Sequence, residues 1–167
     1  REEQEKAFRQ IFVDGETDHW TMFCYLQNLF ADAKEYGSIL QPTALDYAGF
    51  LTAWKTVIEQ KAQEKGLMMW YLAADRFIPA IVELASVLCQ KYDAVVTNPP
   101  YMGSSGMDAN LTNFIKKYYP DSKSDLFAVF IEVCSRMAAE KRYQAMITQH
   151  AWMFLSSYEN LREKMML

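Results

Sequence analysis

The sequence predicts an α/β fold that is rich in helices and holds a few parallel strands. From residue 75 the apolar pattern alternates in the order helix, strand, loop, helix, helix, strand, helix. This alternation is typical of α/β proteins, and the strands are expected to be parallel neighbours. The unbroken apolar run from Ala94 to Val96 favours a strand that is covered on both faces. The 167 residues, 51% of them hydrophobic, suffice for one domain with a real core.

Residues 1–74 are predicted to form a helical region that precedes the α/β core of residues 75–167. An amphipathic helix is expected over residues 1–13, where apolar side chains share one face. A second helix, capped by Thr17 or Asp18, is expected to carry an aromatic stripe into a hydrophobic core.

The rest of this region predicts a short strand and a long helix. The strand is expected over residues 38–41, where Gly37 interrupts the helical pattern. The helix is expected to begin after Thr43 as its N-cap and to run to about Lys65, with Asp46 in the N3 position. Gly66 would then follow its C-terminus.

Residues 67–74 are ambiguous between helix and loop, and the elements of the α/β core follow them. In chain order these are a helix starting near Asp75 and Pro79 and ending at Lys91, a strand over Asp93–Thr97, a helix capped by Asp108 or Asn110, a helix capped by Ser124, an exposed turn at Glu140–Arg142, a strand over Tyr143–Gln149, and a helix opened by Ser156 or Ser157. The helix after Ser124 is apolar on most sides, so it is expected to be buried against the sheet.

The net charge and the positions of the cysteines argue against some classes of function. The net charge of −4 argues mildly against a nucleic-acid-binding domain that stands alone, because such domains usually carry a basic face. Cys24, Cys89 and Cys134 lie far apart among apolar residues, which indicates reduced, buried thiols in a cytoplasmic protein. No CxxC pair or His/Cys cluster suggests a metal site. No apolar run reaches the roughly 18 residues that span a bilayer, so no membrane partner is expected.

The stretch that carries chemistry is Asn98-Pro99-Pro100-Tyr101, between the first predicted strand and a flexible Gly/Ser loop. Ligands of open α/β sheets bind at such strand ends. Consecutive prolines make the turn rigid and remove two N–H donors, so nearby carbonyl oxygens lack partners. Together with the Asn98 amide oxygen, such a carbonyl could hold both hydrogens of an exocyclic amino group. Tyr101 supplies a flat ring on which a base could stack, and the loop could close over the ligand.

The stretch Asp93-Ala-Val-Val-Thr-Asn-Pro-Pro-Tyr101 resembles the amino-methyltransferase motif of N6-adenine-specific DNA methyltransferases. Further segments resemble, in order, those of large bacterial adenine methyltransferases, above all the PglX-type methylases of BREX phage-defence systems and next the fused restriction–modification enzymes. These segments are Phe30-Ala-Asp-Ala-Lys-Glu-Tyr-Gly-Ser-Ile39, Tyr101-Met-Gly-Ser104, Ser124-Asp-Leu-Phe127, Thr148-Gln-His150 and Trp152-Met-Phe154.

This resemblance implies a partial class I, Rossmann-like S-adenosylmethionine methyltransferase fold, and N6-adenine methylation of double-stranded DNA. By position it implies catalytic roles for Asn98, Pro99, Pro100 and Tyr101. The Asn98 amide and the Pro99 carbonyl would bind the target amino group, and Tyr101 would stack on the flipped adenine.

The resemblance also implies a cofactor and a setting. The cofactor is S-adenosylmethionine, and Asp32 and Asp125 are the candidate residues for contacting it. The setting is phage defence or restriction–modification, with proteins of a defence system as partners.

One departure from the family pattern concerns its glycine-rich cofactor loop. No predicted strand here is followed by G-x-G, because the six glycines are scattered along the chain. The target-recognition region is missing as well. We therefore expect the piece alone neither to bind the cofactor well nor to methylate DNA, and we expect one side of the Asp93–Thr97 strand to remain an unpaired sheet edge.

Two other functions stay open. Asn-Pro-Pro-Tyr also occurs in enzymes that methylate protein glutamine side chains and in some RNA guanine-N2 methyltransferases. Alternatively, the chain is a noncatalytic interaction module that keeps the motif as scaffold.

Overall fold

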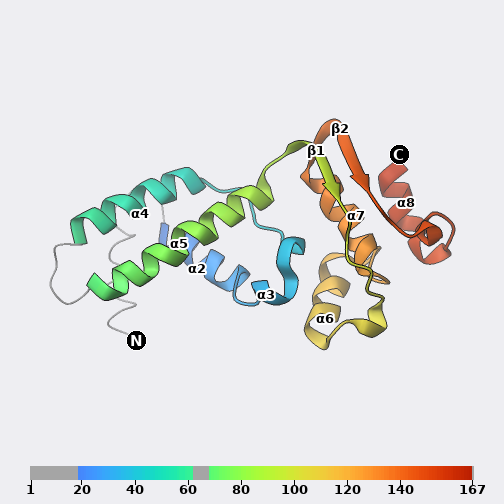
Figure 1. The fold of residues 1–167 in the computed structure, drawn as a ribbon, viewed down its shortest axis with the longest axis horizontal. Coiled ribbons are helices and arrows are strands. Elements are labelled where there is room, and N and C mark those ends of the chain that lie inside the picture. The colour runs from blue at the N-terminus through green and yellow to red at the C-terminus, as the bar shows by residue number, and fades with distance from the viewer. Residues whose placement is uncertain (1–18, 62–67, 167) are drawn as a thin grey trace. The chain divides into compact units, whose positions relative to one another are not determined.

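The computed structural model describes residues 19–61 and 68–166 (Figure 1). The chain divides into two compact units, one of residues 1–33 and 40–89 and the other of residues 34–39 and 90–167. The helix predicted over residues 1–13, the caps at Thr17 and Asp18, and Gly66 lie outside the described residues. None of the described helices is both long enough and apolar enough to cross a membrane.

The first unit is helical. Its main helices are α2 (His19–Leu29), α4 (Tyr47–Lys61) and α5 (Met68–Cys89), and α5 packs against both of the others. Apolar side chains from all three helices meet in one core, whose buried members are Leu26, Tyr47, Phe50, Trp54, Ile78, Val82 and Ala85. The Trp54 indole Nε1 donates to Asp75 Oδ1 at 2.9 Å, so the polar atom of this buried ring has a partner.

Helix α4 begins later than the sequence predicted. Asp46 precedes its first residue, and its Oδ1 accepts from the Gly49 amide at 2.9 Å, so Asp46 and not Thr43 is the N-cap. The Thr43 amide instead donates to the Tyr25 hydroxyl at 2.6 Å. The prediction of Thr43 as the cap was wrong because the helix begins only at Tyr47, which places Asp46 and not Thr43 directly before the first turn.

Helix α5 is continuous through Pro79, where the sequence predicted a helix start. A proline inside a helix costs about 3 kcal/mol relative to alanine. Next to it, Ile78, Val82 and Ala85 are buried in the core of the first unit. Burying an Ile or Val side chain contributes about 1.5–3 kcal/mol, so packing of this helical face outweighs the local cost.

The strand predicted over residues 38–41 is wrong. Helix α3 (Ala33–Tyr36) is followed directly by the 3₁₀ helix η1 (Gly37–Ile39). Gly37 has a φ of +53°, a conformation that glycine adopts without steric cost and that turns the chain. The Tyr119 hydroxyl donates to the Ile39 carbonyl, so a side chain rather than a strand satisfies this backbone acceptor.

The second unit holds a parallel pair of strands, β1 (Tyr92–Thr97) and β2 (Ala138–Met146), in which Thr97 pairs with Met146. Its helices are α6 (Ala109–Tyr118), α7 (Leu126–Met137) and α8 (Glu159–Met166). The prediction of a helix-rich fold with parallel strands is confirmed.

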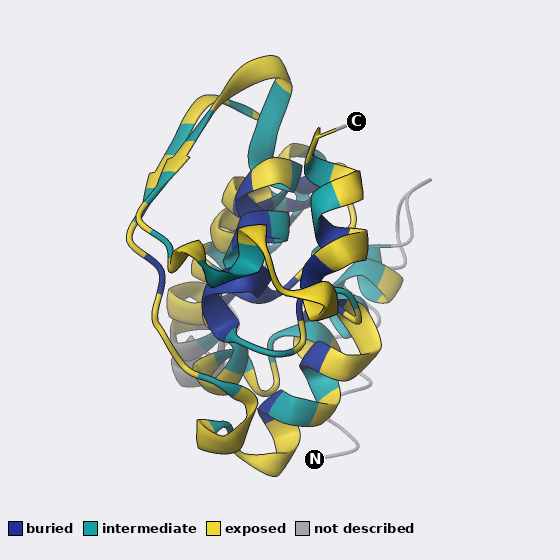
Figure 2. Ribbon diagram, turned by 90° about the vertical axis from the view of Figure 1, so that its right-hand side faces the viewer, coloured by how far each residue is buried: buried dark blue, intermediate teal, exposed yellow. Residues whose placement is uncertain are grey.

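Helix α7 is the central element of this unit, and it packs on both strands as predicted. Figure 2 shows buried residues concentrated in the helices, while the strands are exposed or intermediate. One group of α7 side chains packs with η1 and α6: Leu126, Val129 and Val133 meet Ile39, Leu111 and Ile115. Another group packs with the C-terminal segment: Phe127, Ala128 and Ile131 meet Tyr158 and Leu161.

The sheet departs from the sequence prediction in two ways. Val96 of β1 and Tyr143 of β2 are 75% and 76% exposed, so β1 is not covered on both faces by the described residues. The strand predicted to begin at Tyr143 begins at Ala138, and the predicted turn at Glu140–Arg142 lies inside it. The register shifts between Tyr92 and Ala94, and Lys141 has a φ of +59°, so these residues form an irregular, exposed bulge.

Of the caps predicted for the last helices, that of α6 is confirmed. Asp108 caps α6, since its Oδ1 accepts from the Leu111 amide at 2.7 Å. Helix α7 is capped by Asp125 and not by the predicted Ser124. The serines before α8 form the 3₁₀ helix η4 (Ser156–Tyr158), and α8 starts immediately after it.

Candidate functional site

The candidate site lies where both parallel strands end. β1 stops at Thr97, immediately before Asn98, and the Ile147 amide just after β2 donates to the Thr97 carbonyl at 3.4 Å. The Asn-Pro-Pro-Tyr stretch therefore leaves the sheet at the carboxyl ends of its strands. Ligands of open α/β sheets bind at this edge.

The Tyr101 ring has a defined position. Its hydroxyl donates to the Ile147 carbonyl at 2.8 Å, which joins the motif to the segment after β2. Its ring centroid lies 6.0 Å from that of Phe127 at an interplanar angle of 48°. The side chain is nevertheless 45% exposed, so the ring is supported from one side and accessible from another.

The Phe127 ring continues this aromatic contact into the core. Its centroid lies 6.2 Å from that of Tyr158, which is buried. Burial raises the pKa of the Tyr158 phenol, and the negative charge of Asp125 raises it further. Tyr158 therefore stays a neutral, well-packed support beneath the site.

The other motif residues differ in exposure. Asn98 and Pro100 are exposed and Pro99 is buried. The Asn98 amide is thus accessible to a ligand, and the buried Pro99 ring anchors the turn. The roles predicted for the Asn98 amide and the Pro99 carbonyl remain predictions.

The loop after the motif is attached to the start of α7. The Ser104 amide donates to the Ser124 carbonyl at 3.0 Å, and the Leu126 amide donates to the Met102 carbonyl at 2.9 Å. Gly103 and Asp125 form an antiparallel bridge between these bonds. The sequence predicted a flexible loop that closes over a ligand, but the loop is fixed by backbone hydrogen bonds at its first residues.

The two residues predicted to contact the cofactor have different surroundings. Asp125 is partly buried, and its Oδ1 accepts from the Met102 amide at 3.1 Å and from the Phe127 amide at 3.2 Å. Asp32 is exposed in the turn between α2 and α3, and it belongs to the first unit. Cofactor contact remains a prediction for both.

A cavity of about 200 Å³ lies beside Pro100 in the second unit. Its apolar wall consists of Pro100, Ile39, Leu111, Leu126 and Phe130, and residues 34–38 complete the lining. This cavity was not predicted from the sequence. The only indication of it in the sequence was that the segment around Gly37-Ser38-Ile39 resembles the corresponding segment of the methyltransferase family. In the structure, η1 brings this segment next to the motif.

The segment after β2 is fixed by Arg162 of α8. The Arg162 Nη1 atom donates to the carbonyls of Trp152 and Leu155, both at 2.7 Å. These bonds hold the 3₁₀ helix η3 (His150–Met153) and the residues after it against α8.

The thiols show no arrangement for chemistry. None of the three cysteines forms a disulfide; Cys134 is buried, as predicted, whereas Cys24 and Cys89 are only half-buried. Burial raises the pKa of the Cys134 thiol, which keeps it protonated. Within residues 19–61 and 68–166, no cluster of three or more His, Cys, Asp or Glu side chains is placed to hold a metal ion.

Comparisons with known proteins show which family this chain is similar to. Residues 26–167 match the family described as Eco57I restriction-modification methylase. The adenine-specific methyltransferase BrxX of Escherichia coli O9:H4 (strain HS) is 44% identical over 138 residues, which are 80% of this chain and 11% of that protein. The adenine-specific methyltransferase PglX of Lacticaseibacillus casei (strain Zhang) is 53% identical over 85 residues, which are 51% of this chain and 7% of that protein. The chain thus spans a small part of the length of these relatives.

Proposed function

This chain belongs to the Eco57I restriction-modification methylase family, and from that premise we propose that its full-length protein methylates N6 of adenine in double-stranded DNA, with S-adenosylmethionine as the methyl donor. The family resemblance that the sequence indicated is confirmed. The names of the relatives, both adenine-specific methyltransferases, support adenine as the substrate base. We further propose that β1 and β2 belong to a larger Rossmann-like sheet in the full-length protein, and that it works in the cytoplasm in phage defence.

One observation carries the proposal: the Asn-Pro-Pro-Tyr turn stands at the carboxyl ends of two parallel strands, with an accessible amide and a supported ring. Asn98 is exposed, and Tyr101 is held through its hydroxyl on Ile147. An amino-methyltransferase must hold a planar nitrogen and the ring that bears it. An amide oxygen beside an accessible aromatic ring suits that task.

The chain's own residues would act by positioning. The Asn98 side-chain oxygen and the Pro99 carbonyl accept the two hydrogens of the adenine amino group, and this leaves the nitrogen lone pair free for attack. Tyr101 stacks on the flipped base, an interaction worth about 1–3 kcal/mol per base. S-adenosylmethionine, when bound, supplies a methyl group on a positively charged sulfur. Positioning the adenine nitrogen for attack would supply much of the rate, and the amino group would lose one proton to solvent during or after transfer.

The size and lining of the cavity beside Pro100 support a site for part of the cofactor. Pro100, Leu126 and Phe130 give it flat, apolar walls that suit a planar ring, and residues 34–38 add polar groups at its margin. Its volume of about 200 Å³ is below the roughly 300–1,000 Å³ of sites for whole drug-sized ligands. We propose that it takes the adenine end of S-adenosylmethionine and that other parts of the full-length protein bind the rest.

The test replaces Asn98 by Ala in the full-length protein, produced in a bacterial host that lacks N6-adenine methylation. Loss of the amide should abolish N6-methyladenine in host DNA, measured by mass spectrometry of nucleosides, while circular dichroism stays unchanged. Asn113→Ala, an exposed asparagine on α6, is the matched control and should retain methylation.

The alternatives give other results in the same experiment. Methylglutamine in protein or N2-methylguanine in RNA, without N6-methyladenine in DNA, would assign the site to another substrate. An Asn98→Ala protein that methylates normally but loses a protein partner would instead indicate an interaction module.

A further inference from the structure

Asp125 has two roles in the structure, because one carboxylate oxygen accepts from two separate parts of the chain. The Phe127 amide, at 3.2 Å, belongs to the first turn of α7, so this bond is an N-cap. The Met102 amide, at 3.1 Å, belongs to the residue directly after Tyr101. The same side chain therefore ties the motif to the start of α7.

The start of α7 is a firm support. The residues from Leu126 to Val129 are all buried, and α7 packs on both strands. Backbone bonds run parallel to the Asp125 contact: the Leu126 amide donates to the Met102 carbonyl at 2.9 Å, and the Ser104 amide to the Ser124 carbonyl at 3.0 Å. The peptide group that follows Tyr101 is thus held on a rigid element.

The opposite end of Tyr101 is held independently. Its hydroxyl donates to the Ile147 carbonyl at 2.8 Å, at the end of β2. Two contacts therefore fix the position of the ring. Helix α7 binds the backbone next to Tyr101 through Asp125, and the end of β2 binds the Tyr101 hydroxyl. If the bond from the Met102 amide to Asp125 is lost, the Met102 carbonyl and the Ser104 amide keep their backbone bonds, and the peptide group after Tyr101 gains freedom to shift the ring about its hydroxyl bond.

We propose that Asp125 is a positioning residue for the methyl-transfer site, which sets the location of the Tyr101 ring through the Met102 amide. This inference rests on the proposed function. A carboxylate accepting from backbone amides forms charge-assisted hydrogen bonds, which are stronger than neutral ones. Small displacements of a reacting group cost much in rate, so the anchor affects turnover although Asp125 touches no reacting atom.

The two roles of Asp125 can be separated by side-chain length. Asp125→Ser keeps a good N-cap but has a shorter side chain, which loses the Met102 bond. Asp125→Asn keeps an acceptor oxygen at the same position and restores both bonds. Asp108 supplies the matched control, because it caps α6 through the Leu111 amide at 2.7 Å in the same way.

The experiment uses the full-length protein, with a duplex carrying the sequence that wild-type protein methylates in the host. Asp125→Ser is expected to lower kcat about tenfold, with the KM for S-adenosylmethionine changed less than about twofold. Asp125→Asn should restore most of kcat, and Asp108→Ser should match wild type. Hydrogen exchange of a peptide that covers residues 102–104 should be faster in Asp125→Ser alone.

Three results would overturn the proposal. If Asp125→Ser and Asp108→Ser have equal kcat, Asp125 is only a helix cap. If both Asp125 variants raise the KM for S-adenosylmethionine and retain kcat, Asp125 contacts the cofactor instead. If exchange of residues 102–104 is unchanged in Asp125→Ser, the anchor does not hold the loop. This last readout does not depend on activity, so a wild-type protein that fails to methylate adenine refutes the proposed function and still leaves the anchor tested.

Discussion

At Tyr101 the ring and the hydroxyl have separate partners, so they have separable tasks. The ring rests near Phe127 and is 45% exposed, while the hydroxyl is bonded to the Ile147 carbonyl. A stacking function needs the ring alone. The hydroxyl contributes only by fixing where that ring stands.

We therefore predict unequal effects of two substitutions at this position in the full-length protein. Tyr101→Ala removes the ring, and the loss of about 1–3 kcal/mol of stacking should lower kcat/KM about 5- to 150-fold. Tyr101→Phe keeps the ring and loses one hydrogen bond worth about 1 kcal/mol, so its effect should be at most about fivefold. Methylation kinetics on a cognate duplex measure both.

The control for this pair is Tyr118 of α6, which is 47% exposed and packs on Phe114. Tyr118→Ala should leave kcat/KM unchanged. Equal losses of kcat/KM for Tyr101→Phe and Tyr101→Ala would contradict separate roles for the ring and the hydroxyl. They would mean that the hydroxyl, and not the ring, is the essential group.

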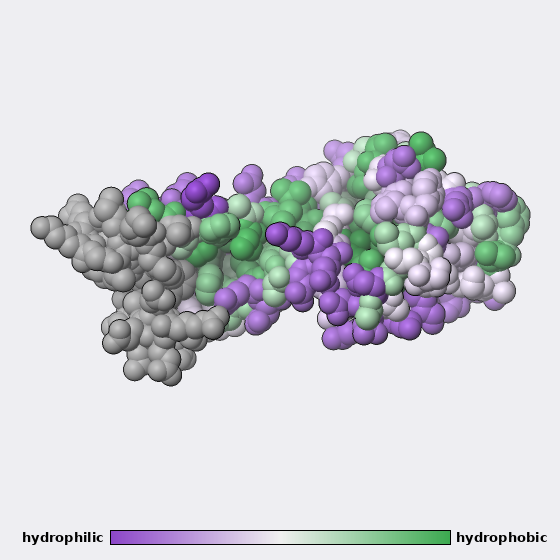
Figure 3. Space-filling model, turned by 60° about the horizontal axis from the view of Figure 1, so that its bottom comes forward, coloured by the Kyte–Doolittle hydropathy of each residue, from purple (hydrophilic) through white to green (hydrophobic). Residues whose placement is uncertain are grey.

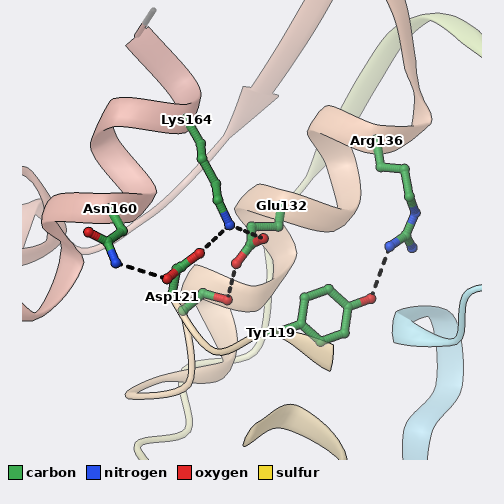
Figure 4. Close-up of polar contacts among 7 residues, drawn as sticks. Tyr119, Asp121, Glu132, Arg136, Asn160 and Lys164 are labelled. Carbon is green, nitrogen blue, oxygen red and sulfur yellow. Dashed lines mark hydrogen bonds and ion pairs between the residues drawn. The ribbon is translucent and has the colours of Figure 1, made fainter. Parts of the chain in front are cut away.

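At the scale of elements, a polar network fastens α8 to α7. Figure 4 shows Lys164 of α8 reaching between Asp121 and Glu132. Asn160 also donates to Asp121, at 3.1 Å, and the fully buried Ser122 hydroxyl donates to Glu132 at 2.6 Å. The side chains of Asp121 and Glu132 are 17% exposed, so water screens these contacts less than on an open surface.

The network predicts a pH dependence for the attachment of α8. The hydrogen bond from Lys164, and then that from Asn160, lower the pKa of Asp121. A lowered folded-state pKa means that the stabilisation is present above the unfolded value of about 3.9 and is lost as pH falls through the folded value. Asp121→Asn should therefore increase hydrogen exchange of residues 159–166 relative to wild type at pH 6, and this difference should shrink as the pH falls below the unfolded value.

The expected size of this effect is modest, since the Lys164 side chain is 51% exposed and such pairs contribute about 1 kcal/mol or less. Asp93 provides the control, because it pairs with Arg142 at 2.8 Å while 85% exposed. Asp93→Asn should change nothing at either pH. If the difference in hydrogen exchange between Asp121→Asn and wild type grew as the pH fell, the pH dependence would have the opposite sign and the mechanism would be refuted.

Element types were predictable from the sequence where one periodic pattern decided them, as for α6, α7 and β1. Boundaries failed where two local signals competed and tertiary contacts chose between them. Ser124 and Asp125 are both good N-cap residues. In the structure Asp125 is the N-cap of α7, and its carboxylate also accepts from the Met102 amide. Residues 38–41 have a strand-like composition, but the positive φ of Gly37 and the Tyr119 hydroxyl on Ile39 favour a 3₁₀ turn.

The candidate site was predictable only as a set of residues adjacent in sequence. Asn98 to Tyr101 were found from the motif, because proline geometry and the preceding strand are local features. The Ile147 carbonyl and the cavity beside Pro100 were not, since they depend on contacts between residues distant in the chain. Backbone carbonyls carry no sequence signal of their own.

At the scale of the molecule, the second unit leaves apolar side chains on an open sheet face. Val96, Tyr143 and Ile147 are 75%, 76% and 66% exposed. Hydrophobic surface also appears between hydrophilic areas on the face drawn in Figure 3. Exposed apolar surface on this scale marks a place where other protein packs. This chain covers only 11% and 7% of the two relatives named above, and those proteins have ample further sequence to cover such a face.

The 167-residue chain by itself is expected to lack a complete cofactor site. Its six glycines, at positions 15, 37, 49, 66, 103 and 106, nowhere form the G-x-G turn after a strand that the family resemblance implies for cofactor binding. The cavity beside Pro100 is too small for the whole cofactor. We therefore expect no S-adenosylmethionine binding at micromolar concentrations and no DNA methylation by this piece. Isothermal titration calorimetry measures the first, with the full-length protein as the positive control and circular dichroism as the check that the piece is folded. Micromolar binding by the folded piece would mean that residues 34–39 and the motif alone make a sufficient cofactor site.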